Sequence, residues 1–167
     1  MLLLSLSSWS REMIEDKYRV LQAQTILFAA ASAAAAAVPI PGLSIAVDVG
    51  ILVSMGRHFV NSFGLSEQNA IAQGLMENAS SAERVRLILS TTAKYATTKG
   101  IMALLKVCAT QTAVEEVARY IPFVGTAVAA SISFATTYTM GGMLLDQIKV
   151  QAEAFANEIV ARAGADA

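Results

Sequence analysis

The sequence predicts an all-α fold, a compact multi-helix bundle with two long apolar helices at its centre. Of its 167 residues, 55% are hydrophobic and only 15% are charged, whereas ordinary soluble domains have roughly 45–50% and 25%. No stretch shows the alternation of a strand over a useful length. Two proline–glycine breaks, at residues 37–48 and 120–128, each open a long stretch with almost no charge. A chain of this length can bury one core, so we expect a single bundle domain.

The first predicted helix begins at Ser10, which serves as its N-cap, and ends before Pro39. Acidic side chains follow Ser10 closely, and negative charge is favourable near the positive end of a helix. Residues 29–37 are alanine apart from Ser32, and alanine has the highest helix propensity. The helix must end at Pro39, because proline removes a backbone donor and forces the preceding residue into an extended conformation.

Glycines and capping residues give the bounds of the later helices. Gly64 is expected to close the second helix and Ser66 to start the third. Ser80 opens the fourth helix as the first residue of a capping box, and Gly100 interrupts it. The predicted helices after the first span residues 43–63, 66–78, 80–99, 101–120 and 126–162. The sequence leaves open whether Gly141 and Gly142 kink the last helix.

The N-terminal residues 1–9 are expected to be the end of a strand and a loop that lead out of an upstream domain. They lack the basic residues of a signal peptide, and their apolar run is too short for one. Residues 10–167 then form the helical bundle domain. Cys108 is the only cysteine, so no disulfide can form within the chain, and its apolar neighbours indicate a buried thiol.

Two uncharged stretches are long enough to cross the roughly 30 Å hydrocarbon layer of a membrane. They cover residues 20–47 and 120–145. The first is broken by Pro39 and Pro41, and alanine contributes little to membrane insertion compared with larger apolar residues. Small residues suit close helix packing in a membrane and in a soluble core alike. A soluble core, reversible membrane association and a spanning hairpin are therefore all open interpretations.

The sequence contains no recognisable catalytic or metal-binding pattern, so we expect no enzymatic activity in this chain. His58 is the only histidine, and a catalytic or metal site would need partners that the spacing does not offer. Asp48 is a lone charge within apolar sequence, which the nearby start of its helix explains. A phosphate-binding loop needs Gly-x-x-x-x-Gly-Lys-Ser/Thr, and no glycine here is followed by lysine. The net charge of −1 gives no general attraction to nucleic acid.

Five segments, in order along nearly the whole chain, carry a family resemblance. They are Leu-Leu-Ser-Leu-Ser-Ser at 3–8, Val-Pro-Ile-Pro-Gly-Leu-Ser-Ile-Ala-Val-Asp at 38–48, Phe-Gly-Leu-Ser at 63–66, Tyr-Ile-Pro-Phe-Val-Gly at 120–125 and Ser-Ile-Ser-Phe-Ala-Thr-Thr-Tyr at 131–138. Together they resemble the end of the G domain and the C-terminal helical domain of the immunity-related (interferon-inducible) GTPases. The family has Phe-Gly-Leu-Asp at the third segment, so Ser66 departs from its pattern. The first segment looks like the strand end and loop that leave the GTP-binding G domain, which is missing here.

The resemblance implies a helical membrane-association and assembly module of a dynamin-like GTPase of innate immunity. Family members bind intracellular or pathogen-vacuole membranes and assemble through nucleotide-dependent contacts. The resemblance therefore implies a cytoplasmic chain, peripheral on an intracellular membrane, with a second copy or a full-length GTPase as its protein partner. GTP and Mg belong to full-length relatives, and this chain is expected to bind no cofactor, no metal and no nucleic acid.

The predicted interaction site consists of residues at the two proline–glycine breaks: Pro39, Pro41, Gly42, Pro122 and Gly125. Helix ends with adjacent apolar residues can enter an interface, although the same residues also suit tight turns inside the bundle. Two other functions stay open, a small integral membrane or pore-forming helical protein and a soluble regulator that pairs with a full-length GTPase. The first predicts retention in membranes after carbonate or high-salt washing. The second predicts a protein partner and no lipid binding.

Overall fold

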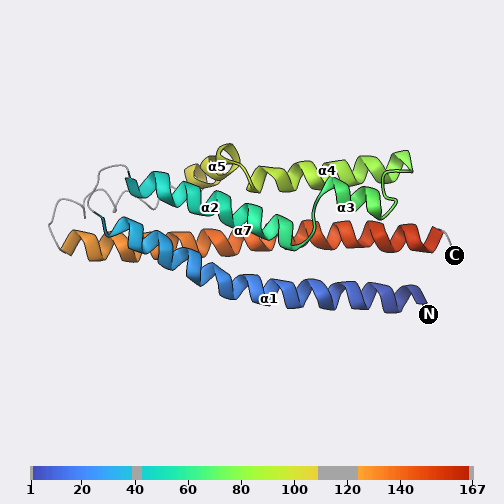
Figure 1. Cartoon of the computed structure of the whole chain (residues 1–167), viewed down its shortest axis with the longest axis horizontal. Helices are drawn as coiled ribbons and strands as arrows, with labels where there is room; N and C mark the ends of the chain where they lie inside the picture. The colour runs from blue at the N-terminus through green and yellow to red at the C-terminus, as the bar shows by residue number, and fades with distance from the viewer. Residues whose placement is uncertain (1, 39–42, 109–123, 166–167) are drawn as a thin grey trace.

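The computed structural model describes residues 2–38, 43–108 and 124–165, with side-chain surroundings for 10–38, 46–104 and 126–165. All regular structure in these ranges is helical (Figure 1), so the predicted all-α fold is confirmed. The helices are α1 (Leu2–Ala36), α2 (Leu43–Ser62), α3 (Glu67–Ala72), α4 (Ala79–Tyr95), α5 (Thr98–Cys108) and α7 (Val124–Ala165).

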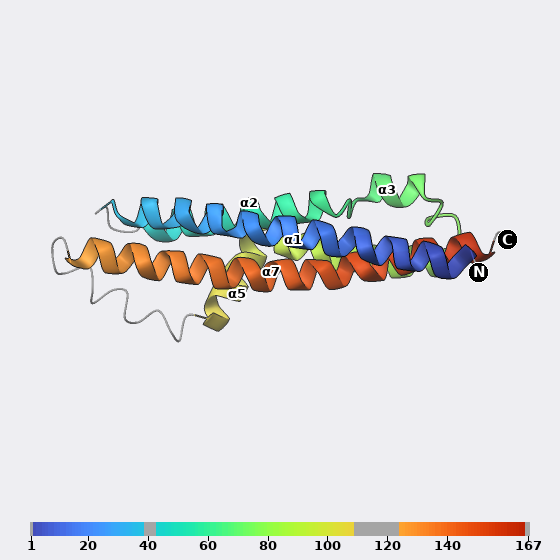
Figure 2. The same cartoon turned by 90° about the horizontal axis from the view of Figure 1, so that it is seen from below.

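The two long helices α1 and α7 form the spine of an elongated bundle. They lie side by side in antiparallel orientation along most of their length, as Figure 1 and Figure 2 both show. At 1.5 Å per residue, the 42 residues of α7 extend about 63 Å. α2 packs against both long helices, α4 packs on α7, and α5 packs on α2 and α4. The two ends of the chain lie at one end of the bundle, and α1 ends where α2 and α7 begin, at the other (Figure 1).

The core changes in character along the bundle. Toward the end that holds the chain termini, large side chains fill it. Phe59, Leu144, Leu145, Ile148 and Phe155 are each at most 3% exposed. Burial of a side chain of this size contributes about 1.5–3 kcal/mol to stability. Toward the opposite end, alanine and hydroxyl side chains replace the large residues between α1 and α7.

Two of the predicted helix bounds are confirmed in detail. Gly64 has a φ of +69°, and the N–H of Leu65 donates to the carbonyl of Val60 over 3.1 Å, which is the pattern of a glycine-closed helix end. The hydroxyl of Ser66 accepts a hydrogen bond from the N–H of Asn69 over 3.2 Å and so caps α3.

The prediction of a strand end and loop at residues 1–9 is wrong for residues 2–9, because α1 already begins at Leu2. Ser10 consequently lies inside α1 and is not its N-cap. No proline or glycine occurs in this segment, and leucine is a good helix former, so nothing local stops the helix from extending toward the N-terminus.

Three later bounds also differ from the predictions. α3 ends at Ala72, well before residue 78, because Gly74 adopts a left-handed conformation with a φ of +67°. The side chain of Asn78, and not that of Ser80, caps α4 and accepts from the N–H of Ser80 over 3.1 Å. Gly100 lies within α5, whose start at Thr98 follows a break after Tyr95. α7 continues as one helix through 141–142, and residues 109–120 of the fifth predicted helix lie outside the described residues.

Candidate interaction surface at the uncharged end

Charged side chains are segregated along the length of the bundle. The segments 20–36 of α1, 46–56 of α2 and 126–145 of α7 meet at the end opposite the chain termini (Figure 1). We call these three segments the uncharged end, because Asp48 is their only Asp, Glu, Lys or Arg residue. Elsewhere on these three helices, every charged residue lies toward the other end of the bundle, which we call the charged end.

Small side chains make the contact between α1 and α7 at the uncharged end. Six of them are at most 6% exposed: Ala29, Ser32, Ala36, Ala129, Ser133 and Thr137. They recur every three or four residues along each helix and therefore share one face. Small and hydroxyl residues in this spacing let two helix backbones approach closely, as they do in helix pairs within membranes.

Gly141 lies where α7 approaches both α1 and α2 closely at the uncharged end. A Cβ atom at this position would lie 2.2 Å from Cε of Met55 on α2 and 2.7 Å from Cγ2 of Thr25 on α1. These distances are far shorter than the roughly 3.5–4.0 Å that two carbon atoms prefer. Only glycine therefore fits here without a shift of its neighbours.

The one charged residue of the uncharged end is covered by hydroxyl groups from the other two helices. Oδ1 of Asp48 is hydrogen-bonded to Oγ of Ser32 on α1 and, over 2.9 Å, to Oγ of Ser133 on α7. The two serine oxygens lie 2.7 Å apart, and Oγ1 of Thr137 lies 2.8 Å from Oγ of Ser32. These four side chains form the hydroxyl cluster. The start of α2, which the sequence suggested as the explanation for Asp48, is thus not its whole environment.

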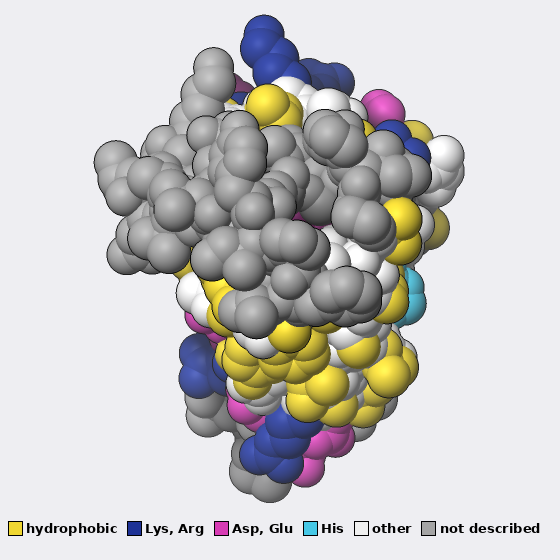
Figure 3. All heavy atoms as spheres, turned by 90° about the vertical axis from the view of Figure 1, so that its left-hand side faces the viewer, with side chains coloured by type: hydrophobic (Ala, Val, Ile, Leu, Met, Phe, Trp, Pro, Cys, Tyr) yellow, Lys and Arg dark blue, Asp and Glu magenta, His cyan; other side chains and the backbone are white. Residues whose placement is uncertain are grey.

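The outer surface of the uncharged end exposes large apolar side chains. Leu27 is 70% exposed and Met143 is 50% exposed, and the same surface carries Val20, Ile26, Val128 and Tyr138. We call these six residues the apolar surface. In a view onto this end, hydrophobic side chains gather beside the residues drawn in grey, and charged side chains lie at the margins (Figure 3). A contiguous exposed apolar patch marks a contact with a membrane or with another protein, and the exposed side chains at this end are candidates for such a contact.

The charged end is held together by ion pairs that link α7 to other elements. Nζ of Lys149 lies 2.6 Å from Oε2 of Glu15 on α1, and this hydrogen bond lowers the pKa of Glu15. Nε of Arg84 on α4 lies 2.6 Å from Oε1 of Glu158, and this hydrogen bond lowers the pKa of Glu158.

A tyrosine–aspartate pair adds a further link between α1 and α7. The hydroxyl of Tyr18 donates to Oδ1 of Asp146 over 2.7 Å. This hydrogen bond, together with desolvation, raises the pKa of Tyr18 to about 12, because ionisation would remove the proton that Asp146 accepts. The ammonium of Lys149 lies 4.5 Å from the centre of the Tyr18 ring.

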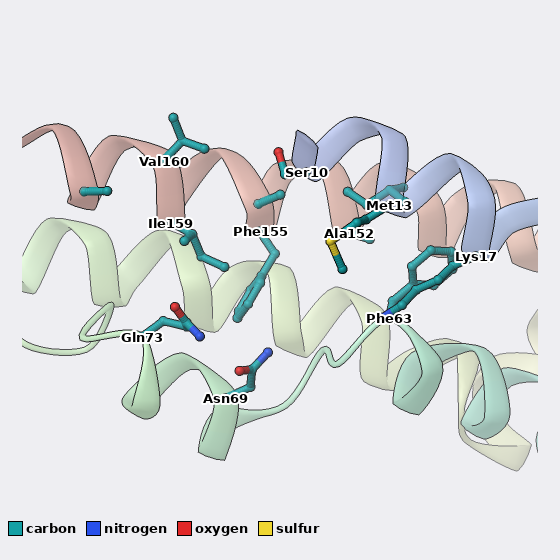
Figure 4. A pocket seen from close by; sticks show the side chains of 13 residues that line it. Ser10, Met13, Lys17, Phe63, Asn69, Gln73, Ala152, Phe155, Ile159 and Val160 are labelled. Atoms are coloured by element: carbon teal, nitrogen blue, oxygen red, sulfur yellow. The ribbon is translucent and has the colours of Figure 1, made fainter. Parts of the chain in front are cut away.

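A pocket of about 330 Å³ lies at the charged end, between α1, α3 and α7. Figure 4 shows Phe155 and Ile159 reaching from α7 toward Asn69 and Gln73. Nδ2 of Asn69 donates to the carbonyl of Gly64 over 2.9 Å, so this amide at the rim is already used within the fold. The apolar lining and the few polar groups give the pocket no catalytic arrangement.

The structure describes little of the predicted interaction site. Pro39, Pro41, Gly42 and Pro122 lie outside the described residues, and Gly125 lies in the first turn of α7, where no side-chain surroundings are described. The interaction site at the two breaks therefore stays a prediction. Sequence reasoning missed the hydroxyl cluster, although Ser32 is the single polar residue in an alanine run and signals it.

No catalytic or metal-binding arrangement is found among the described side chains. Nε2 of His58 lies 2.7 Å from Oε1 of Gln24, and the histidine is exposed near the end of α2. The described residues contain no group of three His, Cys, Asp or Glu side chains that could hold a metal ion. One helix in the described part of the chain, Thr126–Ala165, is long and apolar enough to cross a membrane by length and composition alone.

Two curated proteins are similar to most of this chain. Interferon-inducible GTPase 5 of Bos taurus is 31% identical over 142 residues, and interferon-inducible GTPase 5 of Rattus norvegicus is 30% identical over 140 residues. Each match covers 83% of this chain and 30% of the relative, so the chain spans less than a third of the length of these relatives. No family model and no solved structure matches the sequence.

Proposed function

From the relationship of this chain to the interferon-inducible GTPases, which extends over 83% of its length, we propose that it is a helical membrane-association and assembly module of such a GTPase. The module acts at the cytoplasmic face of an intracellular membrane. Binding and hydrolysis of GTP, and the Mg²⁺ that they use, belong to a longer relative, because this sequence has no glycine followed by lysine and hence no phosphate-binding loop.

The uncharged end is the observation that carries the membrane part of the proposal. A Lys, Arg or Asp side chain near the centre of a bilayer costs roughly 2.5–3.5 kcal/mol, and the apolar surface contains none. Transfer of its half-exposed Leu, Ile, Val and Met side chains into hydrocarbon returns about 1 kcal/mol each. Several such contributions together are enough for reversible binding to a neutral lipid surface.

The packing inside the uncharged end supports the same role. Large hydrophobic cores depend on exclusion from water, and this driving force disappears when lipid replaces water. Contacts between small residues and between hydroxyl groups do not depend on water in this way. The contact of α1 with α7, made by residues such as Ala29 and Ser133, would therefore persist at a membrane surface.

Flotation of the 167-residue chain with phosphatidylcholine vesicles tests the proposal. We expect the wild-type chain to float and Leu27→Asp to bind at least tenfold more weakly, since an inserted Asp costs about 2.5 kcal/mol or more. Leu87→Asp is the matched control, because Leu87 is 67% exposed on α4, outside the uncharged end, and we expect it to float like the wild type. Absence of flotation, or an equal loss in both variants, contradicts the proposal.

The same preparation separates the proposal from its alternatives. A chain that resists carbonate washing is an integral membrane protein and not a peripheral module. A chain that never floats but captures a full-length GTPase is a soluble regulator. Assembly is measured by chemical cross-linking with and without vesicles, and we expect cross-linked species above the mass of one chain when vesicles are present.

A further inference from the structure

The pocket at the charged end has the size of a site for a single alkyl chain. Its volume of about 330 Å³ lies at the lower end of the range of small-molecule sites, roughly 300–1,000 Å³. A methylene group takes about as much space as a water molecule in the liquid, roughly 30 Å³, so the pocket has room for about ten carbon atoms. Sites of this size are lined mainly by apolar side chains, and a few polar groups fix the orientation of the ligand.

The described lining of the pocket is an elongated apolar surface. Its residues on α7 recur every three or four positions and therefore share one face of the helix. They are Ala152, Phe155, Ala156, Ile159, Val160 and Ala163. From the first to the last they extend about 16 Å along the helix axis. Met13 and Ile14 line the pocket from α1, and Phe63 lines it just after the end of α2. This shape suits an unbranched chain that lies along α7.

Polar side chains accompany this apolar lining. Nζ of Lys17 donates a hydrogen bond to the carbonyl of Ser62 over 2.9 Å, and Ser62 directly precedes Phe63. The bond holds the ammonium group beside Phe63, and Figure 4 shows the two side chains together at one end of the pocket. An ammonium group has three N–H donors, so it can also donate to a ligand. The amides of Asn69 and Gln73 line the pocket on and just after α3.

We propose that this pocket binds one medium-chain fatty acid, with its alkyl chain along the apolar face of α7 and its carboxylate at Lys17. Lys17 is the one charged side chain of the described lining, and a carboxylate complements it because it carries a single negative charge and accepts N–H donors. A phospholipid has two longer chains, which exceed the room for about ten carbon atoms. The size and the charge of the pocket therefore both favour a free fatty acid.

Fatty-acid binding goes beyond the proposed function and is independent of it. The pocket lies at the charged end, whereas the apolar surface lies at the opposite end of the bundle. A ligand that binds only the folded chain stabilises it by mass action. The pocket is lined from α1, α3 and α7, so a bound fatty acid would add apolar contacts that join these three helices.

Isothermal titration calorimetry with fatty acids of six to fourteen carbon atoms, without vesicles and below the concentrations at which they form micelles, tests the proposal. We expect one molecule of decanoate to bind per chain. Each added methylene group should tighten binding about fourfold while it is buried, and the gain should stop near ten carbon atoms. Absence of saturable binding, or a gain that continues through fourteen carbon atoms, overturns the proposal.

The place of the carboxylate is tested by Lys17→Gln. The glutamine amide can still donate to the carbonyl of Ser62, so the substitution removes mainly the charge. We expect decanoate to bind about three- to fivefold more weakly, as for a solvent-exposed ion pair, and decanol to bind equally well to both proteins. Arg19→Gln is the matched control, because Arg19 is exposed on α1 outside the described lining. An equal effect of the two variants on decanoate overturns the assignment of the carboxylate to Lys17.

The place of the alkyl chain is tested by Ala156→Leu, which adds three carbon atoms to the pocket wall. We expect decanoate to bind at least tenfold more weakly, because fewer methylene groups can be buried. Ala161→Leu is the matched control, since Ala161 is exposed on α7 outside the described lining. Leu27→Asp, which tests the membrane role, is expected to leave decanoate binding unchanged. If Leu27→Asp abolishes binding, or if the two alanine variants bind alike, the fatty acid does not occupy this pocket, and the flotation result still stands by itself.

Discussion

Replacement of Gly141 by alanine tests how closely the three helices approach at the uncharged end. The added methyl carbon would lie 2.2 Å from Cε of Met55 and 2.7 Å from Cγ2 of Thr25. Met55 can turn its terminal methyl group aside, because methionine is flexible. Thr25 is β-branched and only 1% exposed, so its side chain has no other place to go. We therefore expect α1 to be pushed away from α7.

Replacement of the neighbouring Gly142 by alanine is the control, and the difference in stability between the two variants measures the cost of overpacking at Gly141. A Cβ atom at Gly142 would meet nothing within 4 Å, and both glycines lie in α7. Either alanine variant gains up to about 1 kcal/mol in helix propensity. Only Gly141→Ala also suffers overpacking, which costs roughly 1–3 kcal/mol. We expect Gly142→Ala to be slightly more stable than the wild type and Gly141→Ala to lie about 1–3 kcal/mol below Gly142→Ala.

Urea unfolding followed by far-UV circular dichroism measures this difference. In thermal unfolding it corresponds to about 2–4 °C per kcal/mol for a chain of this size. If both variants unfold at the same urea concentration, the helices are not in contact at Gly141, and the description of a tightly packed uncharged end is wrong.

Three further predictions concern the charged end and a helix cap, all measured by urea unfolding. The hydrogen bond from Arg84 lowers the pKa of Glu158 in the folded state. The stabilisation of the fold by this pair is therefore present above the unfolded pKa of about 4.3 and is lost as the pH falls through the folded pKa. Glu158→Gln is expected to differ from the wild type in stability more at neutral pH than in acid, and a difference that is constant with pH contradicts this. The hydrogen bond to Asp146 raises the pKa of Tyr18 to about 12, while an unfolded tyrosine ionises near 10. The stabilisation of the fold by this hydrogen bond is therefore complete below about pH 10 and is lost as the pH rises to about 12. Tyr18→Phe should abolish this part of the loss of stability in alkali, and an unchanged dependence of stability on pH would rule out the hydrogen bond between Tyr18 and Asp146. Ser66→Ala removes the acceptor at the start of α3 and is expected to cost about 1 kcal/mol, whereas no loss means that the cap is dispensable.

Helix bounds set by a single strong local signal could be predicted from the sequence. The end of α1 before Pro39 and the closure of α2 at Gly64 depend on backbone geometry that only these residue types impose or favour. Helix bounds at which two neighbouring residues give the same signal could not be predicted in this way. Asn78 and Ser80 are both good N-cap residues, and only the folded geometry decides that the Asn78 side chain reaches the backbone N–H.

The candidate site could be predicted only in part. The two charge-free stretches are visible in the sequence, but their meeting at one end of the bundle requires the antiparallel pairing of α1 and α7. The hydroxyl cluster joins residues far apart in the chain, since Ser32 and Ser133 are separated by 101 positions and Asp48 and Ser133 by 85. Local patterns carry no information about such pairs. The exposure of Leu27 likewise could not be predicted from the sequence, because an apolar residue such as leucine is more often buried. It depends on how the helices pack.

A polarity-sensitive fluorophore on the apolar surface tests the membrane role of the uncharged end most directly. The label is placed at Leu27→Cys or at Leu87→Cys, in a chain whose native Cys108 is replaced by serine. On addition of phosphatidylcholine vesicles, a blue shift of the emission at position 27 and none at position 87 is the predicted result. An unchanged emission at position 27, or the same shift at both positions, would contradict the assignment of this end to the membrane.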